Sequence, residues 1–120
     1  MKGILINVKT NEVTDVTLDP SKRTLDEMYR LIGCEMVEVA TDIEHDNVAD
    51  TVWVDEEGLL SMDNSTRFFT IENGHQPFAG NGLILGANFN NGKSIVTHLT
   101  ADDVRQKVKF HSLNQVRQMK

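Results

Sequence analysis

Apolar and polar residues alternate at the start of the chain. Ile4, Ile6 and Val8 share one face of the first segment, and residues 13–18 form a second extended segment after a short polar break. A period of two places alternate side chains on one face of a β-strand. The pattern therefore predicts an antiparallel hairpin that ends before Pro20, because proline cannot donate a ladder hydrogen bond.

The period then changes to that of a helix. Apolar side chains recur at i, i+3, i+4 and i+7, a spacing that places them on one helical face; they are Leu25, Met28, Tyr29 and Ile32. Thr24 and Glu27 have the spacing of a capping box, and Gly33 is suited to end the helix. A second helix is predicted over residues 100–108, with Thr100 as its N-cap.

A second hairpin is predicted within residues 77–99. The apolar run 83–85 and the β-branched run 94–99 flank the turn sequence Asn90-Asn91-Gly92. The glycines that surround this stretch are Gly80, Gly82 and Gly86. At such positions the backbone can bend or a neighbouring chain segment can approach closely.

The same stretch contains a loose match to the phosphate-binding loop of nucleotide hydrolases. Ala87 is followed after four residues by Gly92-Lys93-Ser94. A working loop requires a helix directly after the Lys-Ser pair, because the helix N-terminus and successive N–H groups hold the phosphates. Residues 95–97 instead favour a strand. The sequence therefore predicts a hairpin here and makes a hydrolase the weakest of the functional alternatives.

The central part of the chain predicts strands over residues 34–40, 51–54 and 67–71, with a single helical turn as the alternative for the last. An acidic segment lies between the first two strands and contains Asp42, Glu44, His45, Asp46 and Asp50. Dense carboxylates can bind calcium, but the segment lacks the DxDxDG pattern and the bidentate glutamate at position twelve. We expect a solvated loop.

Together these elements predict a single α+β domain: a mainly antiparallel sheet with two helices packed on it. A chain of 120 residues that is 39% apolar and 25% charged suits one globular domain. We expect the α+β domain to cover residues 1–109. Residues 110–120 are predicted to form a basic C-terminal extension, helical or frayed.

The sequence also favours one compartment. It has no apolar run near the ~18 to 20 residues that span a membrane, and its N-terminus lacks the features of a signal peptide. The single cysteine, Cys34, cannot form an internal disulfide and fits a reducing environment. We expect a cytoplasmic protein with no membrane partner.

Charge is distributed unevenly along the chain. Up to Val104 there are eighteen acidic and seven basic residues, whereas residues 105–120 contain five basic and no acidic ones. An acidic body works against direct nucleic-acid binding and complements a basic surface of a protein partner. The candidate partner-binding residues are Asp42, Glu44 and Asp46. Oligomeric state is left open.

Signatures of catalysis and metal binding are missing from the sequence. The histidines are scattered and lack an HExxH or CxxC companion, and no serine sits in a GxSxG elbow. Cys34 follows the first predicted helix rather than opening one, so no helix N-terminus stabilises its thiolate. We predict no catalytic residue, no cofactor and no metal, with a metal site built from distant residues as the alternative.

A small anionic ligand is the remaining candidate for binding. Arg67 is an isolated cation in an acidic region, suited to bidentate contact with a carboxylate or phosphate. Asn81 and Asn88 offer amides that donate and accept hydrogen bonds, and Phe78 offers an apolar platform. The alternative assigns the asparagines to turns, Phe78 to the core and Arg67 to a local ion pair.

The order of several segments resembles that of a known family. The segments are KGILINV, LDEMYRLIGCEMVEV, VDEEGLL followed by residues 64–67, and FAGNGLILGANFNNGKSIVTHLTADDV. They resemble, over residues 2–108, the uncharacterised domain-of-unknown-function 3846 family of small proteins from phages, prophages and other mobile elements. The resemblance transfers no activity and no residue role. It implies a phage-like origin, and small phage proteins of this kind often act in host takeover or counter-defence.

The sequence-based hypothesis is therefore a small cytoplasmic binding protein that inhibits a host process by binding a host protein. The alternative is sequestration of a small anionic ligand, such as a nucleotide signal, in a pocket near Arg67 and Asn81.

Overall fold

The computed structural model describes residues 1–45, 48–72, 76–88, 90–91 and 93–119. Asp46 and Gly92, which the sequence singled out above, lie outside the described residues. The described elements are β1 (Lys2–Asn7), β2 (Glu12–Thr17), α1 (Thr24–Ile32), β3 (Val37–His45), β4 (Val48–Asp55), β5 (Arg67–Ile71), β6 (Phe78–Ala79), β7 (Gly82–Ala87), β8 (Ser94–Ile95), α2 (Ala101–Arg105), β9 (Val108–Ser112) and α3 (Leu113–Arg117).

The strands form two antiparallel sheets. Sheet A has the order β2-β1-β7-β4-β3, with β8 paired to the end of β7, and sheet B has the order β6-β5-β9. Every pairing is antiparallel. Ile84 of β7 lies opposite Ile4 on one side and Val52 on the other, so one row of buried side chains crosses the centre of sheet A. The predicted β1–β2 and β7–β8 hairpins are both confirmed, the second in a short form.

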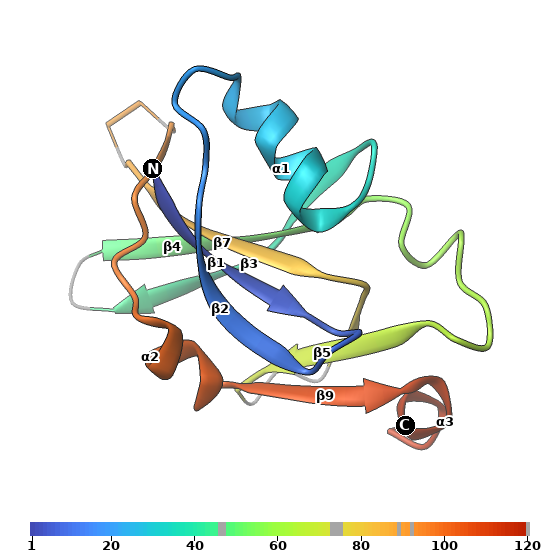
Figure 1. Ribbon diagram of the computed structural model, residues 1–120. Helices are drawn as coiled ribbons and strands as arrows, with labels where there is room; N and C mark the ends of the chain where they lie inside the picture. The colour runs from blue at the N-terminus through green and yellow to red at the C-terminus, as the bar shows by residue number, and fades with distance from the viewer. Residues whose placement is uncertain (46–47, 73–75, 89, 92, 120) are drawn as a thin grey trace.

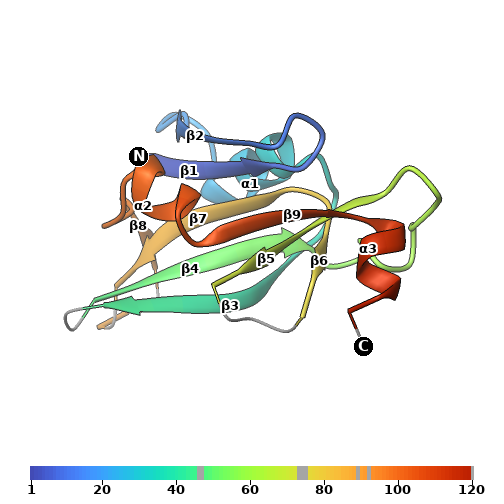
Figure 2. The same cartoon turned by 90° about the horizontal axis from the view of Figure 1, so that it is seen from below.

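The molecule has three layers. Sheet B lies across one face of sheet A and α1 covers part of the other face (Figures 1 and 2). Phe69 and Ile71 of β5 pack against Ile4, Val52 and other residues of sheet A in the larger core. The predicted mainly antiparallel α+β architecture is therefore confirmed, but strands dominate it and the described residues contain three short helices instead of two.

Close contact between the sheets requires a glycine. A Cβ atom placed on Gly82 of β7 would lie 2.6 Å from the Cζ atom of Phe69, a separation that real side chains do not reach. The absence of a side chain therefore lets the Phe69 ring rest directly on β7. This matches the close approach that the sequence predicted at Gly82.

Helix α1 packs on sheet A through part of the predicted stripe. Met28 and Ile32 are buried against Leu83 and Leu85 of β7, whereas Leu25 remains 47% exposed. The helix ends at Gly33, whose φ of 83° places it in the left-handed conformation.

The predicted capping box of α1 is wrong. The N-cap is Arg23 and makes no side-chain cap hydrogen bond. The Glu27 carboxylate accepts a hydrogen bond from the Asp19 N–H (2.8 Å) and pairs with Arg30. The sequence spacing favoured Thr24 as the N-cap. The Glu27 carboxylate instead binds the Asp19 N–H and Arg30, so it does not close a capping box with Thr24.

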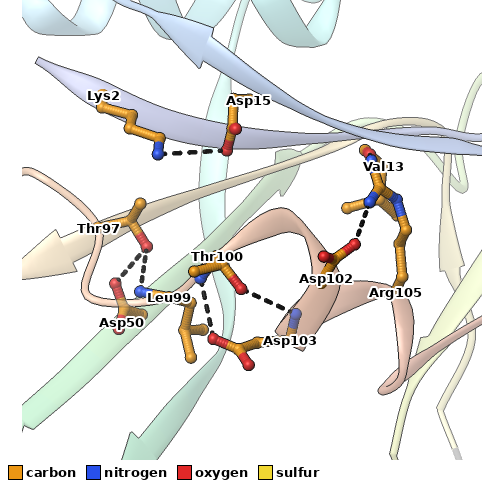
Figure 3. Close-up of polar contacts among 10 residues, drawn as sticks. All are labelled: Lys2, Val13, Asp15, Asp50, Thr97, Leu99, Thr100, Asp102, Asp103 and Arg105. Carbon is orange, nitrogen blue, oxygen red and sulfur yellow. Dashed lines mark hydrogen bonds and ion pairs between the residues drawn. The ribbon is translucent and has the colours of Figure 1, made fainter.

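Helix α2 begins as predicted. The Thr100 hydroxyl accepts from the Asp103 N–H (3.1 Å), and the Asp103 carboxylate accepts from the Thr100 N–H (3.0 Å) (Figure 3). Arg105 pairs with Asp102 and donates from Nη2 to the carbonyl oxygen of Val13 (2.8 Å). Through this last bond α2 covers part of the outer edge of β2.

The residues after α2 continue the sheet. Strand β9 spans Val108–Ser112 and pairs with all of β5. The predicted boundary between residues 109 and 110 therefore falls inside a strand. Leu113 of α3 is buried against Phe68 and Ala79, so this segment contributes to the core.

Candidate functional site

The described part of the acidic segment lies in two paired strands, so the predicted solvated loop is wrong there. Asp42 and Glu44 lie in β3, and Asp50 lies in β4 with no exposed surface. A register shift between Val39 and Thr41 interrupts the alternation of β3. The predicted strand over residues 34–40 therefore ended too early, because the period of two restarts after this irregularity.

Carboxylates of this hairpin belong to a long acidic stretch of sequence. Residues 31–66 contain ten aspartates and glutamates and no lysine or arginine. The stretch runs from the end of α1 through β3 and β4 to the segment before β5, and β3 forms one edge of sheet A (Figure 2). An edge that carries one sign of charge attracts partners of the opposite sign.

Two of the three predicted partner-binding residues share one face of β3. Asp42 and Glu44 are exposed and separated by Ile43, which is buried in the larger core on the opposite face. The Asp42 carboxylate accepts a hydrogen bond from the Thr51 hydroxyl of β4 (3.0 Å), which holds it in place. Asp46 lies outside the described residues.

A groove runs between this edge and sheet B. Two adjoining hollows, of about 260 Å³ and about 300 Å³, share Ala40, Gln76 and Phe78. We call this the β3–β6 groove, since it separates β3 from β6. Its apolar lining comprises Val39, Ala40, Ile43, Val54, Leu59, Ile71, Pro77, Phe78 and Ala79, and its charged lining comprises Glu38, Asp42, Glu44, Asp55, Glu56 and Glu72.

The groove combines apolar surface with negative charge. Val39 is 51% exposed and Leu59 is 59% exposed. No described residue that lines the groove is a lysine, arginine or histidine. Among its carboxylates Glu72 is already paired with Lys107. An apolar hollow with an acidic rim is suited to a ligand that is apolar on one side and cationic on the other.

The residues predicted to bind an anion lie in different places. Arg67 and Asn81 line a second, open hollow of about 600 Å³, together with Lys9 and Arg30. Phe78 belongs to the β3–β6 groove instead. Asn88 lines neither hollow.

Each of these side chains also has a local structural contact. Arg67 Nη2 donates to the Asn11 side-chain oxygen (3.0 Å), and the Asn81 side-chain oxygen accepts from the Val8 N–H (3.0 Å). The Asn88 side-chain oxygen accepts from the Asn90 N–H (2.9 Å). The Phe78 ring lies 5.4 Å from that of Phe69, centroid to centroid. The structure thus contains the turn and packing contacts that the sequence offered as the alternative.

An ion pair between buried Glu27 and the half-exposed Arg30 borders the hollow of Arg67. Glu27 is 1% exposed, and Arg30 donates to both of its carboxylate oxygens, at 2.8 and 3.0 Å. The hydrogen bond from Arg30, and after it the one from the Asp19 N–H, lowers the pKa of Glu27 from 4.5 to about 2. The positive charge of Arg30 is therefore already balanced by the carboxylate of Glu27, which weakens its attraction for an anionic ligand.

Opposing charges also line this second hollow. Asp55 and Asp63 are among its residues, as is the C-terminal end of α1. A helix C-terminus carries partial negative charge and disfavours anions. Hydrogen bonds from Ser65 keep the pKa of Asp63 low, so this carboxylate stays charged. The hollow thus has both signs of charge.

The buried aspartate of β4 organises a chain segment. Asp50 accepts hydrogen bonds from the Thr97 hydroxyl (2.7 Å) and the His98 N–H (2.9 Å), and its other oxygen lies 3.4 Å from His98 Nδ1 (Figure 3 shows Asp50 with Thr97). The Thr97 hydroxyl in turn accepts from the Leu99 N–H. These bonds fix residues 97–99 against β4.

Neither a metal centre nor a reactive thiol stands out in the described chain. The described residues hold no cluster of three histidines, cysteines or carboxylates that suits a metal ion. Burial raises the pKa of the Cys34 thiol, which lowers its share of nucleophilic thiolate. Ser94 follows Lys93 into strand β8 instead of a helix, so the geometry of a phosphate-binding loop is missing there.

Sequence reasoning missed the β3–β6 groove. Glu38, Val39 and Leu59 were assigned no role, since a groove between two sheets requires the pairing of β5 with β6 and β9. The signal available in the sequence was the absence of lysine and arginine from residues 31–66.

Comparison with known proteins finds one family. A family model described as Domain of unknown function (DUF3846) matches residues 1–109. No curated protein and no solved structure matches the chain. In the described part of the chain, no helix has the length and apolar character needed to cross a membrane.

Proposed function

The chain belongs to the family described as Domain of unknown function (DUF3846), and from this premise we propose that it is a non-enzymatic binding protein whose acidic edge occupies a basic surface of a host protein. In this proposal the chain comes from a phage or a similar mobile element and inhibits a host process. One observation carries the proposal: Asp42 and Glu44 project from an edge strand in a stretch that has ten carboxylates and no basic residue.

Electrostatics explains how such an edge would work. Opposite charges steer two proteins together and raise the association rate, and they disfavour partners of the wrong sign. Screening acts over about 8 Å at physiological ionic strength. The association rate with the partner should therefore fall steeply as salt is added, whereas the rate of dissociation should change less.

Native mass spectrometry of the chain purified from bacterial cells tests this proposal. The wild type should carry a protein of defined mass, and the double variant Asp42→Lys, Glu44→Lys should lose it. A matched control, Glu12→Lys with Asp15→Lys, makes the same change of charge at exposed positions of β2, at the opposite edge of sheet A. Equal retention of the partner by all three proteins would refute the acidic edge as the binding surface.

A second candidate function has its own observation. Arg67 and Asn81 line one hollow with Lys9 and Arg30, which supports sequestration of a small anion such as a nucleotide. The opposing charges described above weigh against it, so we rank it second. Native mass spectrometry separates the two candidates, because a small ligand adds only its own mass.

The affinity of the Arg67→Ala variant for the ligand tests this second candidate. Arg67→Ala removes a bidentate contact worth about 1.5 to 3 kcal/mol. Ligand binding should weaken roughly tenfold to a hundredfold, with the melting temperature nearly unchanged. Lys22→Ala, an exposed cation outside this hollow, serves as the control.

A further inference from the structure

Strand β3 has an outer edge without a partner strand. It runs over nine residues and pairs with β4 on one side; no other described strand pairs with it. An unpaired edge presents a row of backbone N–H and C=O groups that can bind another strand. The opposite edge of sheet A differs, because α2 lies beside β2 and Arg105 binds the Val13 carbonyl there.

The two faces of β3 differ in chemistry. Ile43 is buried in the core beside the groove, whereas the side chains of Asp42 and Glu44 alternate with it and lie exposed at the rim of the groove. Side chains of an added strand would alternate in the same way. Those on the groove side would contact Val54 and Phe78, and those on the other side would meet the carboxylates.

A second copy of this chain does not fit the edge. Antiparallel pairing of β3 with its own copy would bring the carboxylates of one β3 close to those of the other. Like charges opposite one another on paired strands are destabilising. The complementary occupant is a strand with lysine or arginine at every second position.

We infer that the β3–β6 groove binds an extended segment of a partner protein in which basic and apolar residues alternate, and that this segment adds as a strand to the free edge of β3. The inference rests on the proposed function and specifies how the acidic edge engages its partner. Backbone hydrogen bonds supply affinity in this mode, and the alternating side chains supply specificity.

The probe for this inference is a short synthetic peptide of alternating lysine and valine, titrated into the full chain and followed by NMR. Binding should slow hydrogen exchange of the outward-facing β3 amides. The double variant Asp42→Asn, Glu44→Gln should weaken binding about tenfold or more. The control variant Glu12→Gln with Asp15→Asn, which removes the same charge from β2 at the opposite edge of sheet A, should bind like the wild type.

Two N-methylated peptides separate strand addition from simple charge attraction. One is methylated on its valine nitrogens and the other on its lysine nitrogens, so each keeps its positive charge. In strand addition, alternate residues point their N–H groups toward β3, and only one of the two peptides should lose binding. Equal binding by both would overturn strand addition and leave the acidic edge intact as a binding surface.

Three further results would overturn strand addition to β3 or the proposed function. No binding of the parent peptide by the wild type would overturn the inference. A dimer through β3 in the free protein would overturn it as well, because the edge would already be occupied. If the partner found by native mass spectrometry survives charge reversal at Asp42 and Glu44, the proposed function fails, whatever the peptides do.

Discussion

The carboxylate of Asp50 and the hydroxyl of Thr97 form a buried hydrogen bond of 2.7 Å. The bond joins β4 to the segment after β8, 47 residues further along the chain. Asp50 has no exposed surface, so its carboxylate oxygens need hydrogen-bond donors from the protein. The Asp50–Thr97 hydrogen bond thus links two distant chain segments inside the protein.

Removing the donor of this bond should destabilise the fold. Thr97→Val keeps the shape of the side chain but removes a charge-assisted hydrogen bond worth about 1.5 to 3 kcal/mol. The free energy of unfolding in urea should fall by that amount. Thr17→Val, at an exposed position of β2, should stay within about 0.5 kcal/mol of the wild type. Equal stability of both variants would show that the buried bond contributes nothing.

The Glu27–Arg30 pair predicts a specific dependence of stability on pH. The pKa of Glu27 is lower in the folded protein than its ordinary value of 4.5, at about 2. The folded state therefore gains stability from ionised Glu27 above pH 4.5, and this gain disappears as the pH falls toward 2. The melting temperature measured across this range should show the loss.

The variant Glu27→Gln isolates that contribution. Its side chain does not ionise, so the difference in stability between wild type and variant should be largest near neutral pH and shrink as the medium becomes acidic. A difference that is constant from pH 7 down to pH 2 would contradict the assignment of the lowered pKa to this residue.

Two positions on α1 provide a matched test of its packing. Met28 is buried against sheet A, and Leu25 on the same helix is 47% exposed. Met28→Asp should cost several kcal/mol, because it buries a charge without a partner. Leu25→Asp should cost far less, since its carboxylate stays in water and lies near the helix N-terminus. Thermal melts compare the two, and similar losses would contradict the observed orientation of the helix.

Lys93 should have no role in nucleotide hydrolysis. The next residue, Ser94, begins strand β8, so no helix N-terminus faces a phosphate there. Lys93→Ala should leave the behaviour of the protein toward ATP and GTP unchanged. Detection of Mg²⁺-dependent turnover that vanishes in this variant would refute the hairpin interpretation of the whole stretch.

The features that were predicted correctly depend on interactions between residues that are close in sequence. The β1–β2 and β7–β8 hairpins and the Thr100 cap follow from turn chemistry and alternation within a few residues. Sheet B could not be predicted in this way, because β5 and β9 pair across a long separation in sequence. The first part of β3 was predicted, but its continuation after Ala40 was missed because of the register shift there.

The candidate sites likewise depend on contacts between residues that are far apart in sequence. The sequence analysis expected Asp42 and Glu44 in a loop, whereas both lie in strand β3. It also assigned Phe78 and Arg67 to one ligand site, although the two residues line different hollows. Which side chains share a hollow depends on how the two sheets pack. No spacing rule within one segment contains that information.

The order of strands in sheet B has a consequence for how the protein is made. Strand β5 can pair with β6 once residue 79 has left the ribosome, but its other edge stays unpaired until β9, at residues 108–112, has also emerged. Until then Phe68 lacks its contact with Leu113. Nascent chains paused in this interval expose apolar surface and an unpaired edge, the features that chaperones bind and that promote aggregation. The period in which the chain is most vulnerable therefore ends only when β9 has left the ribosome and paired with β5.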